Sequence, residues 1–86
     1  MKYRIFYKPK AKKFIEGLRD KVLQKRLLTG IDRLSEDAHP INSIKMGGSD
    51  DFYRIRVGDY RIIYQVDQGV LTILVLTIGH RREVYR

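Results

Sequence analysis

The second half of the chain is a series of strand-like segments separated by short turns. Residues 52–57, 60–66 and 70–78 are rich in β-branched and aromatic residues, and a further short strand is expected at residues 44–46. Residues 70–78 are apolar at almost every position, which is expected of a strand that is paired within the sheet or covered on both sides. Gly58-Asp59 is typical of a two-residue hairpin turn. These features predict a sheet built mainly of antiparallel strands.

The first half predicts one strand and then helix. Residues 2–7 have strand composition, and Pro9 suits the first turn of a helix. The apolar residues that follow fall at helical spacing in two series, with a break near residues 19–20. The order β-α-α-β-β-β-β predicts an α+β domain, with two N-terminal helices, or one kinked helix, packed on one face of a mostly antiparallel sheet of four to five strands. We expect residues 1–86 to form a single domain. The two series are Ala11, Phe14, Ile15 and Leu18, then Leu23, Leu27, Ile31 and Leu34.

The charge of the chain indicates a polyanionic partner. Eighteen Lys and Arg residues against ten Asp and Glu residues give a formal net charge of +8. Nucleic acid is the first candidate for such a partner, and an acidic protein is the alternative. The chain has no cysteine and no apolar stretch that approaches the ~20 residues of a membrane span, so we expect a cytoplasmic protein without disulfides or membrane contact.

The predicted hairpin gathers arginines on one face of the sheet. If residues 58 and 59 form the turn, Arg56 lies opposite Arg61, and both share a face with Arg54. Like charges directly opposite each other cost about a few tenths to 1 kcal/mol unless an anion lies between them. Since guanidinium groups bind phosphate in a bidentate manner, the pattern predicts a phosphate site. The alternatives are an exposed face with scattered charge and a face covered by an acidic partner.

The C-terminal residues 79–86 add further candidates. We expect residue 76 to lie opposite residue 61, so that the chain leaves the sheet at the end that holds the Gly58-Asp59 turn. Arg81 and Tyr85 would then reach Arg56 and Arg61. His80 is a candidate acid or base, because histidine titrates near neutral pH.

Several of these motifs together resemble the RelE family of the RelE/ParE toxin superfamily. The resemblance rests on residues 53–64 (Tyr-Arg-Ile-Arg-Val-Gly-Asp-Tyr-Arg-Ile-Ile-Tyr), preceded by residues 44–47 and followed by residues 79–81 and 84–85. It implies the toxin of a type II toxin-antitoxin system, a ribosome-dependent endoribonuclease that cleaves mRNA in the ribosomal A site and so inhibits translation. It also implies a cognate RelB-like antitoxin that holds the toxin inactive.

The same resemblance implies roles for individual residues. Arg61 and Arg81 would act on the scissile phosphate, Arg54 and Arg56 would position flanking phosphates, and Tyr85 would stack on a base or transfer a proton. Arginine replaces the lysine of known family members at positions 54 and 56, and because arginine keeps its proton near neutral pH, it cannot serve there as a base. Further RNA contacts are expected from Lys45, Arg82 and Arg86.

The expected reaction is a metal-independent attack of the ribose 2′-oxygen on the adjacent phosphate. The chain lacks cysteine and shows no paired-carboxylate spacing, so we expect neither a metal nor another cofactor. We also expect no DNA binding by the toxin alone. Two other functions stay open. One is a ParE-like toxin that poisons DNA gyrase on the same scaffold, and the other is a basic RNA- or protein-binding module without catalytic activity.

Overall fold

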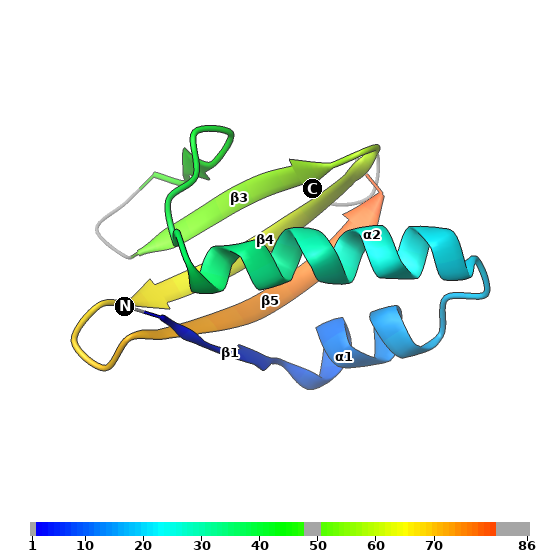
Figure 1. The fold of residues 1–86 in the computed structure, drawn as a ribbon, viewed down its shortest axis with the longest axis horizontal. Coiled ribbons are helices and arrows are strands. Elements are labelled where there is room, and N and C mark those ends of the chain that lie inside the picture. The colour runs from blue at the N-terminus through cyan, green and yellow to red at the C-terminus, as the bar shows by residue number, and fades with distance from the viewer. Residues whose placement is uncertain (1, 48–50, 81–86) are drawn as a thin grey trace.

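The computed structural model describes residues 2–47 and 51–80. It has the predicted order of elements, with one short 3₁₀ helix, η1, added after the second α-helix (Figure 1). The elements are β1 (Arg4–Tyr7), α1 (Pro9–Glu16), α2 (Lys21–Asp32), η1 (Arg33–Ser35), β2 (Ile44–Lys45), β3 (Phe52–Val57), β4 (Tyr60–Asp67) and β5 (Thr72–His80).

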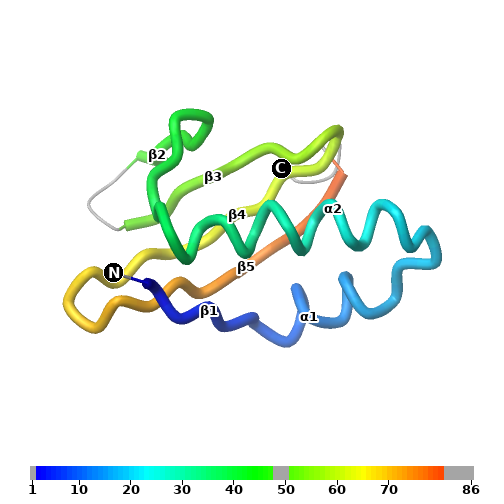
Figure 2. The backbone as a smooth tube through the Cα atoms, in the orientation of Figure 1, coloured from blue at the N-terminus to red at the C-terminus, as the bar shows by residue number. Residues whose placement is uncertain are grey.

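The strands form one five-stranded sheet in the order β1-β5-β4-β3-β2. β1 pairs in parallel with β5, and the other neighbours are antiparallel. Figure 2 shows β1 and the short β2 at opposite edges. The apolar C-terminal strand β5 lies between β1 and β4, as its composition predicts, although β5 begins two residues later than expected and β4 extends one residue further.

The two helices are separate, which decides between the alternatives that the sequence left open. Pro9 occupies the first turn of α1, where its missing N–H is not needed. The side chain of Asp20 caps α2 by accepting hydrogen bonds from the backbone N–H groups of Val22 and Leu23, both at 3.1 Å. The break near residues 19–20 is therefore a new helix start and not a kink.

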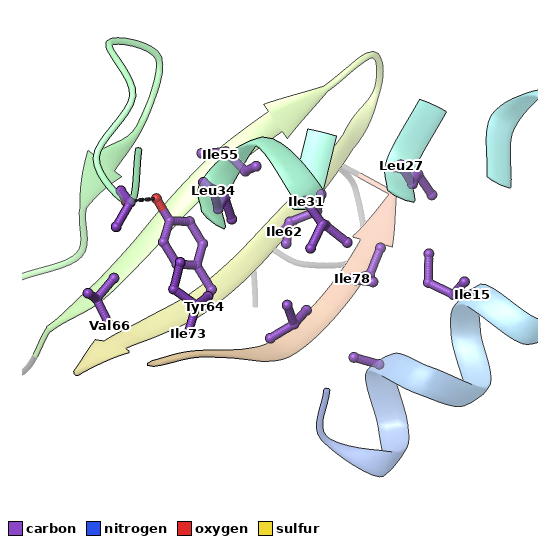
Figure 3. Packing of buried hydrophobic residues seen from close by; sticks show 13 residues of the cluster. Ile15, Leu27, Ile31, Leu34, Ile55, Ile62, Tyr64, Val66, Ile73 and Ile78 are labelled. Atoms are coloured by element: carbon purple, nitrogen blue, oxygen red, sulfur yellow. Dashed lines mark hydrogen bonds between the residues drawn. The ribbon is translucent and has the colours of Figure 1, made fainter. Parts of the chain in front are cut away.

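Both helices pack on the same face of the sheet and bury one apolar core against it (Figure 3). Inside this core, the hydroxyl of Tyr64 in β4 donates a hydrogen bond to the carbonyl of Ala38 at 2.8 Å, which ties the segment after η1 to the sheet. Burial raises the pKa of Tyr64 to about 12. The other core residues are Ala11, Ile15, Leu27, Ile31, Leu34, Ile55, Ile62, Val66, Ile73, Val75 and Ile78.

The opposite face of the sheet carries no helix among the described residues (Figure 1). Side chains alternate along a strand, so the residues next to the buried ones point to this side. We call this surface the open face. In β3 and β4 it is formed by Phe52, Arg54, Arg56, Arg61, Ile63, Gln65 and Asp67.

Candidate functional site

The turn between β3 and β4 sets the geometry of the site. Gly58 has a φ of +60°, and Asp59 is not among the residues with positive φ, as in a type II′ turn. The observed register pairs Val57 with Tyr60 and Arg56 with Arg61. The predicted hairpin is therefore confirmed, together with its register.

The three hairpin arginines lie on the open face, as predicted, but they differ in exposure. Arg56 is exposed, Arg54 is partly buried, and the relative exposure of Arg61 is 3%. Arg56 and Arg61 are direct cross-strand partners. Because arginine stays protonated, two positive charges meet here, and in the described structure Arg56 presents the accessible one.

The end of β5 differs from the prediction in a way that matters for His80. The β4–β5 turn is longer than expected, because Asp67 pairs with Thr72. In addition, β5 has one extra residue, Leu76, opposite the step from Ile63 to Tyr64. Together these two changes bring Gly79, and not residue 76, opposite Arg61. The strand does end beside the β3–β4 turn, as predicted. The shift of an odd number of residues, however, moves the side chain of His80 to the other face.

His80 consequently belongs to the helix face. It pairs with Tyr60, and its ring lies edge-on to the Tyr60 ring with 5.4 Å between centroids. Tyr60 in turn packs near Phe14 of α1, with 6.0 Å between ring centroids. The structure therefore does not bring His80 together with Arg56 and Arg61.

Lys45 is also separated from the arginines. In β2 it pairs with Tyr53, whose ring stacks on buried Tyr64, and this places Lys45 on the helix face at the edge of the sheet. Its neighbour Ile44 pairs with Arg54 and lies on the open face instead. The remaining predicted residues, Arg81, Arg82, Tyr85 and Arg86, lie outside the described residues.

Comparisons with known proteins agree with this fold. A family model described as the ParE toxin of the type II toxin-antitoxin system parDE matches residues 2–85. The chain belongs to this toxin superfamily, RelE/ParE. An Escherichia coli protein described as a RelE-like toxin is 31% identical to the toxin over 83 residues, which are 94% of this chain and 85% of that protein.

Solved RelE structures show the same fold. The RelE–RelB complex of Pyrococcus horikoshii OT3 contains a chain that is 30% identical to this toxin, with a TM-score of 0.82, covering 98% of this chain and 100% of that chain. The isolated E. coli RelE toxin is 26% identical, with a TM-score of 0.77, covering 96% and 90% of the two chains. These matches identify the chain as a RelE-family toxin.

A basic groove of about 660 Å³ lies between α2 and β3 of the toxin. Lys25, Arg26 and Arg33 from the helix side line it together with Arg56. The sequence analysis assigned none of these three helix cations to the site. One signal was available, because Gly30 within α2 permits a close approach: a Cβ built on it would lie 2.8 Å from Cγ2 of Val57.

Arg26 also reaches the hairpin turn of the toxin. Its Nη2 lies 3.4 Å from the position that a Cβ on Gly58 would take. α2 therefore contacts the end of the hairpin that carries Arg56 and Arg61.

The described residues contain neither a candidate metal site nor a candidate membrane span. Within residues 2–47 and 51–80, no group of three or more His, Cys, Asp or Glu side chains is placed to hold a metal ion. No helix in these ranges is long and apolar enough to cross a membrane.

Proposed function

We propose that this toxin is an endoribonuclease that cleaves mRNA and so inhibits translation. The observation that carries the proposal is the pair Arg56 and Arg61, directly opposite each other on the open face, with Arg54 two residues away on the same face. Such a pair is electrostatically unfavourable by itself and favourable around a phosphate. The net charge of +8 adds a long-range attraction for RNA.

The part of the open face that lies next to the β3–β4 turn is suited to binding an anion. Among the described residues of β3, β4 and β5, Asp67 is the one carboxylate on this face. It lies six residues along β4 from Arg61, or about 20 Å at the usual rise of a strand. Its carboxylate accepts hydrogen bonds from the backbone N–H groups of Gly69 and Val70, at 3.0 and 3.2 Å. The one carboxylate that the described strands place on the open face therefore lies far from Arg61.

In the proposed reaction, the ribose 2′-oxygen attacks phosphorus and the 5′-oxygen leaves, which gives a 2′,3′-cyclic phosphate and a 5′-hydroxyl end. Arg56 contacts the non-bridging phosphate oxygens, where negative charge develops. Arg61, the cross-strand partner of Arg56, is 3% exposed, and its positive charge adds to the attraction for the phosphate. Neither arginine acts as the base, because both keep their protons.

The proton transfers need other groups. Since His80 lies on the helix face, we do not assign it a role at Arg56. The late residues Arg81 and Tyr85 remain the candidates for transition-state contact and for base stacking or proton transfer, and Arg82 and Arg86 for RNA binding.

We further propose a RelB-like antitoxin as the partner and the ribosomal A site as the place of cleavage. Relatives from P. horikoshii and E. coli form RelE–RelB complexes, and this supports the antitoxin. A cytoplasmic location follows from a ribosomal target.

The test is cleavage by the purified toxin of an mRNA bound to ribosomes and of the same mRNA alone, with 5′ ends mapped. We expect cuts within the coding region. Arg56→Ala should cleave at least about 100-fold more slowly than wild type, the usual effect of losing one charge-stabilising group. Lys13→Ala removes an exposed cation of α1 and is the matched control. New RNA ends that form equally fast with Arg56→Ala would contradict the role of Arg56.

A second candidate function is inhibition of DNA gyrase, and the ParE description of the matching family model favours it. A supercoiling assay with purified gyrase separates the two candidates. Loss of supercoiling without new RNA ends supports the gyrase function, and neither effect would leave a non-catalytic binding module.

A further inference from the structure

One row of residues on the open face runs across four strands of the sheet. Phe6 of β1 pairs with Leu74 of β5, and Leu74 pairs in turn with Gln65 of β4. Gln65 then pairs with Phe52 of β3. Each of the four lies next to at least one residue that packs in the core, so all four point to the open face. We call these four residues the cross-sheet row.

Two phenylalanines form the ends of the cross-sheet row. Since neighbouring strands lie about 4.8 Å apart, the two ends are separated by roughly 14 Å. Phe6 is 46% exposed and Phe52 is partly buried. Neither belongs to the apolar core, although burial of an aromatic ring is strongly favourable. The third phenylalanine of the chain, Phe14, packs near Tyr60 on the helix side of the sheet.

Polar and cationic groups accompany the two rings. The guanidinium carbon of Arg4 lies 5.5 Å from the ring centroid of Phe6, and Arg4 is exposed. Arg54 follows Phe52 by two residues on the same face. Gln65 lies between the two rings, and its amide can both donate and accept hydrogen bonds. The row therefore combines ring faces, an amide and nearby arginines.

These features favour single-stranded RNA over an apolar protein segment. Aromatic rings stack on the bases of single strands while cations attract the backbone, and sheets with exposed aromatic residues are a common platform for this purpose. An apolar protein segment would instead bury the amide of Gln65, which is costly unless the amide finds a partner.

The position of the row on the face also points to RNA. Phe52 lies four residues along β3 from Arg56, or about 13 Å, so the row continues the surface that we assign to the scissile phosphate. Asp67 lies beyond Gln65 on β4, on the side of the row away from Arg56, and its carboxylate accepts hydrogen bonds from the next turn. The phosphates are therefore expected on the side of the row that carries Arg54.

We propose that the cross-sheet row is a base-binding subsite for single-stranded RNA. One base stacks on the ring of Phe52 and another stacks at Phe6, where the guanidinium plane of Arg4 adds a second stacking surface. Gln65 hydrogen-bonds the edge of a base between them. The subsite holds nucleotides that flank the scissile phosphate at Arg56, and the inference rests on the proposed ribonuclease function.

Two probes separate bases from phosphates. The first is a short 2′-O-methyl oligoadenylate, which cannot be cleaved because its 2′-oxygen is blocked, and the second is an abasic oligomer of the same length. The toxin should bind the oligoadenylate at least about tenfold more tightly than the abasic oligomer, since stacking contributes for each base. Equal binding of the two probes would mean that only the backbone is held, and would overturn the subsite.

Matched variants at Phe52 test the stacking itself. Phe52→Leu keeps an apolar side chain without a ring face and should weaken oligoadenylate binding at least about fivefold, whereas Phe52→Tyr keeps the ring and should stay within about twofold. Both should bind the abasic oligomer like wild type. Phe6→Leu and Phe6→Tyr repeat the comparison, and circular dichroism confirms that each variant is folded. Oligoadenylate binding that is as tight with leucine as with tyrosine would fit an apolar protein-docking surface and overturn the proposal.

The three phenylalanines allow a direct observation of the site. In toxin with isotope-labelled phenylalanine rings, the signals of Phe6 and Phe52 should shift when oligoadenylate is added. Phe14 lies on the helix side and serves as the internal reference that changes little. If the signals of Phe6 and Phe52 move no more than that of Phe14, RNA binds elsewhere and the inference fails.

The inference and the proposed ribonuclease function can fail separately. If oligoadenylate binding follows the expected pattern while the toxin cleaves no mRNA, the ribonuclease proposal fails and the subsite stands. If mRNA is cleaved in a manner that depends on Arg56 while Phe52→Leu and Phe6→Leu bind oligoadenylate like wild type, the subsite is wrong and the ribonuclease function stands.

Discussion

Arg56 and Arg61 are cross-strand partners, yet Arg56 is exposed to solvent and Arg61 is only 3% exposed. One positive charge of the pair is therefore held within the protein and the other at its surface. A phosphate bound at Arg56 would be attracted by the positive charge of both guanidinium groups. Like charges directly opposite each other across an antiparallel pair destabilise a sheet.

Replacing Arg56 by glutamine should therefore stabilise the isolated toxin. We expect the free energy of unfolding to rise by about a few tenths to 1 kcal/mol at low ionic strength, because one of two opposed like charges is removed. The gain should shrink as salt is added, because salt screens exposed charges. Urea denaturation at two salt concentrations measures it. Lys10→Gln, which removes an exposed charge on α1, is the control, and an equal gain there would contradict the pairwise explanation.

The conformation of Gly58 predicts a cost for any side chain at the turn. At a φ of +60°, alanine should lower the free energy of unfolding by about 1–2 kcal/mol, the usual penalty of this region for residues other than glycine. Asp59→Ala changes the neighbouring turn residue without this penalty and should cost less. Equal losses for the two variants in urea denaturation would argue against the conformational cause.

The contact between Gly30 and Val57 predicts coupling between α2 and the hairpin. Alanine at position 30 gains about 1 kcal/mol in helix propensity, but its methyl group would lie 2.8 Å from Cγ2 of Val57, and overpacking costs about 1–3 kcal/mol. We expect Gly30→Ala to be neutral or destabilising in wild type and stabilising in the Val57→Ala background. A double-mutant cycle measures the coupling. The same effect in both backgrounds would rule out the steric explanation.

The buried phenol of Tyr64 predicts a loss of stability in alkali. Its pKa is raised from 10.0 to about 12, so the stability that the neutral phenol contributes is complete below pH 10 and is lost as the pH rises towards 12. Tyr64→Phe should lose about 1 kcal/mol at neutral pH with the hydrogen bond to Ala38, and should lose less further stability above pH 10.

Urea denaturation at several pH values checks this prediction. Burial also raises the pKa of Tyr7, so part of the alkaline slope should remain in Tyr64→Phe. Tyr7→Phe is the matched variant, and it should still show the alkaline loss of stability that is due to Tyr64. A slope between pH 10 and pH 12 that is identical in wild type and Tyr64→Phe would contradict the assignment.

The features that the sequence predicted correctly depend on local geometry. A two-residue turn at Gly58-Asp59 fixes the pairing of Arg56 with Arg61, and the alternation of side chains then fixes the open face. Neither step requires knowledge of the rest of the molecule. The helix positions followed from apolar spacing in the same way.

The features that were missed depend on contacts between distant segments. The bulge between Ile63 and Tyr64 and the length of the β4–β5 turn changed the partner of Arg61, and with it the side of the sheet that carries His80. No local pattern marks that bulge. The basic groove requires α2 to pack against β3 at Gly30, so its cations could not be distinguished from solvated helix residues before the tertiary structure was known.

The pairing of β1 with β5 joins residues 4–7 to residues 72–75. During synthesis the first strand therefore leaves the exit tunnel long before its only strand partner in the described sheet exists. Contacts of such wide sequence separation form late, since the intervening chain must first be ordered. A nascent chain interrupted before residue 72 lacks both β5 and a sheet position for β1, so incomplete synthesis yields no assembled toxin.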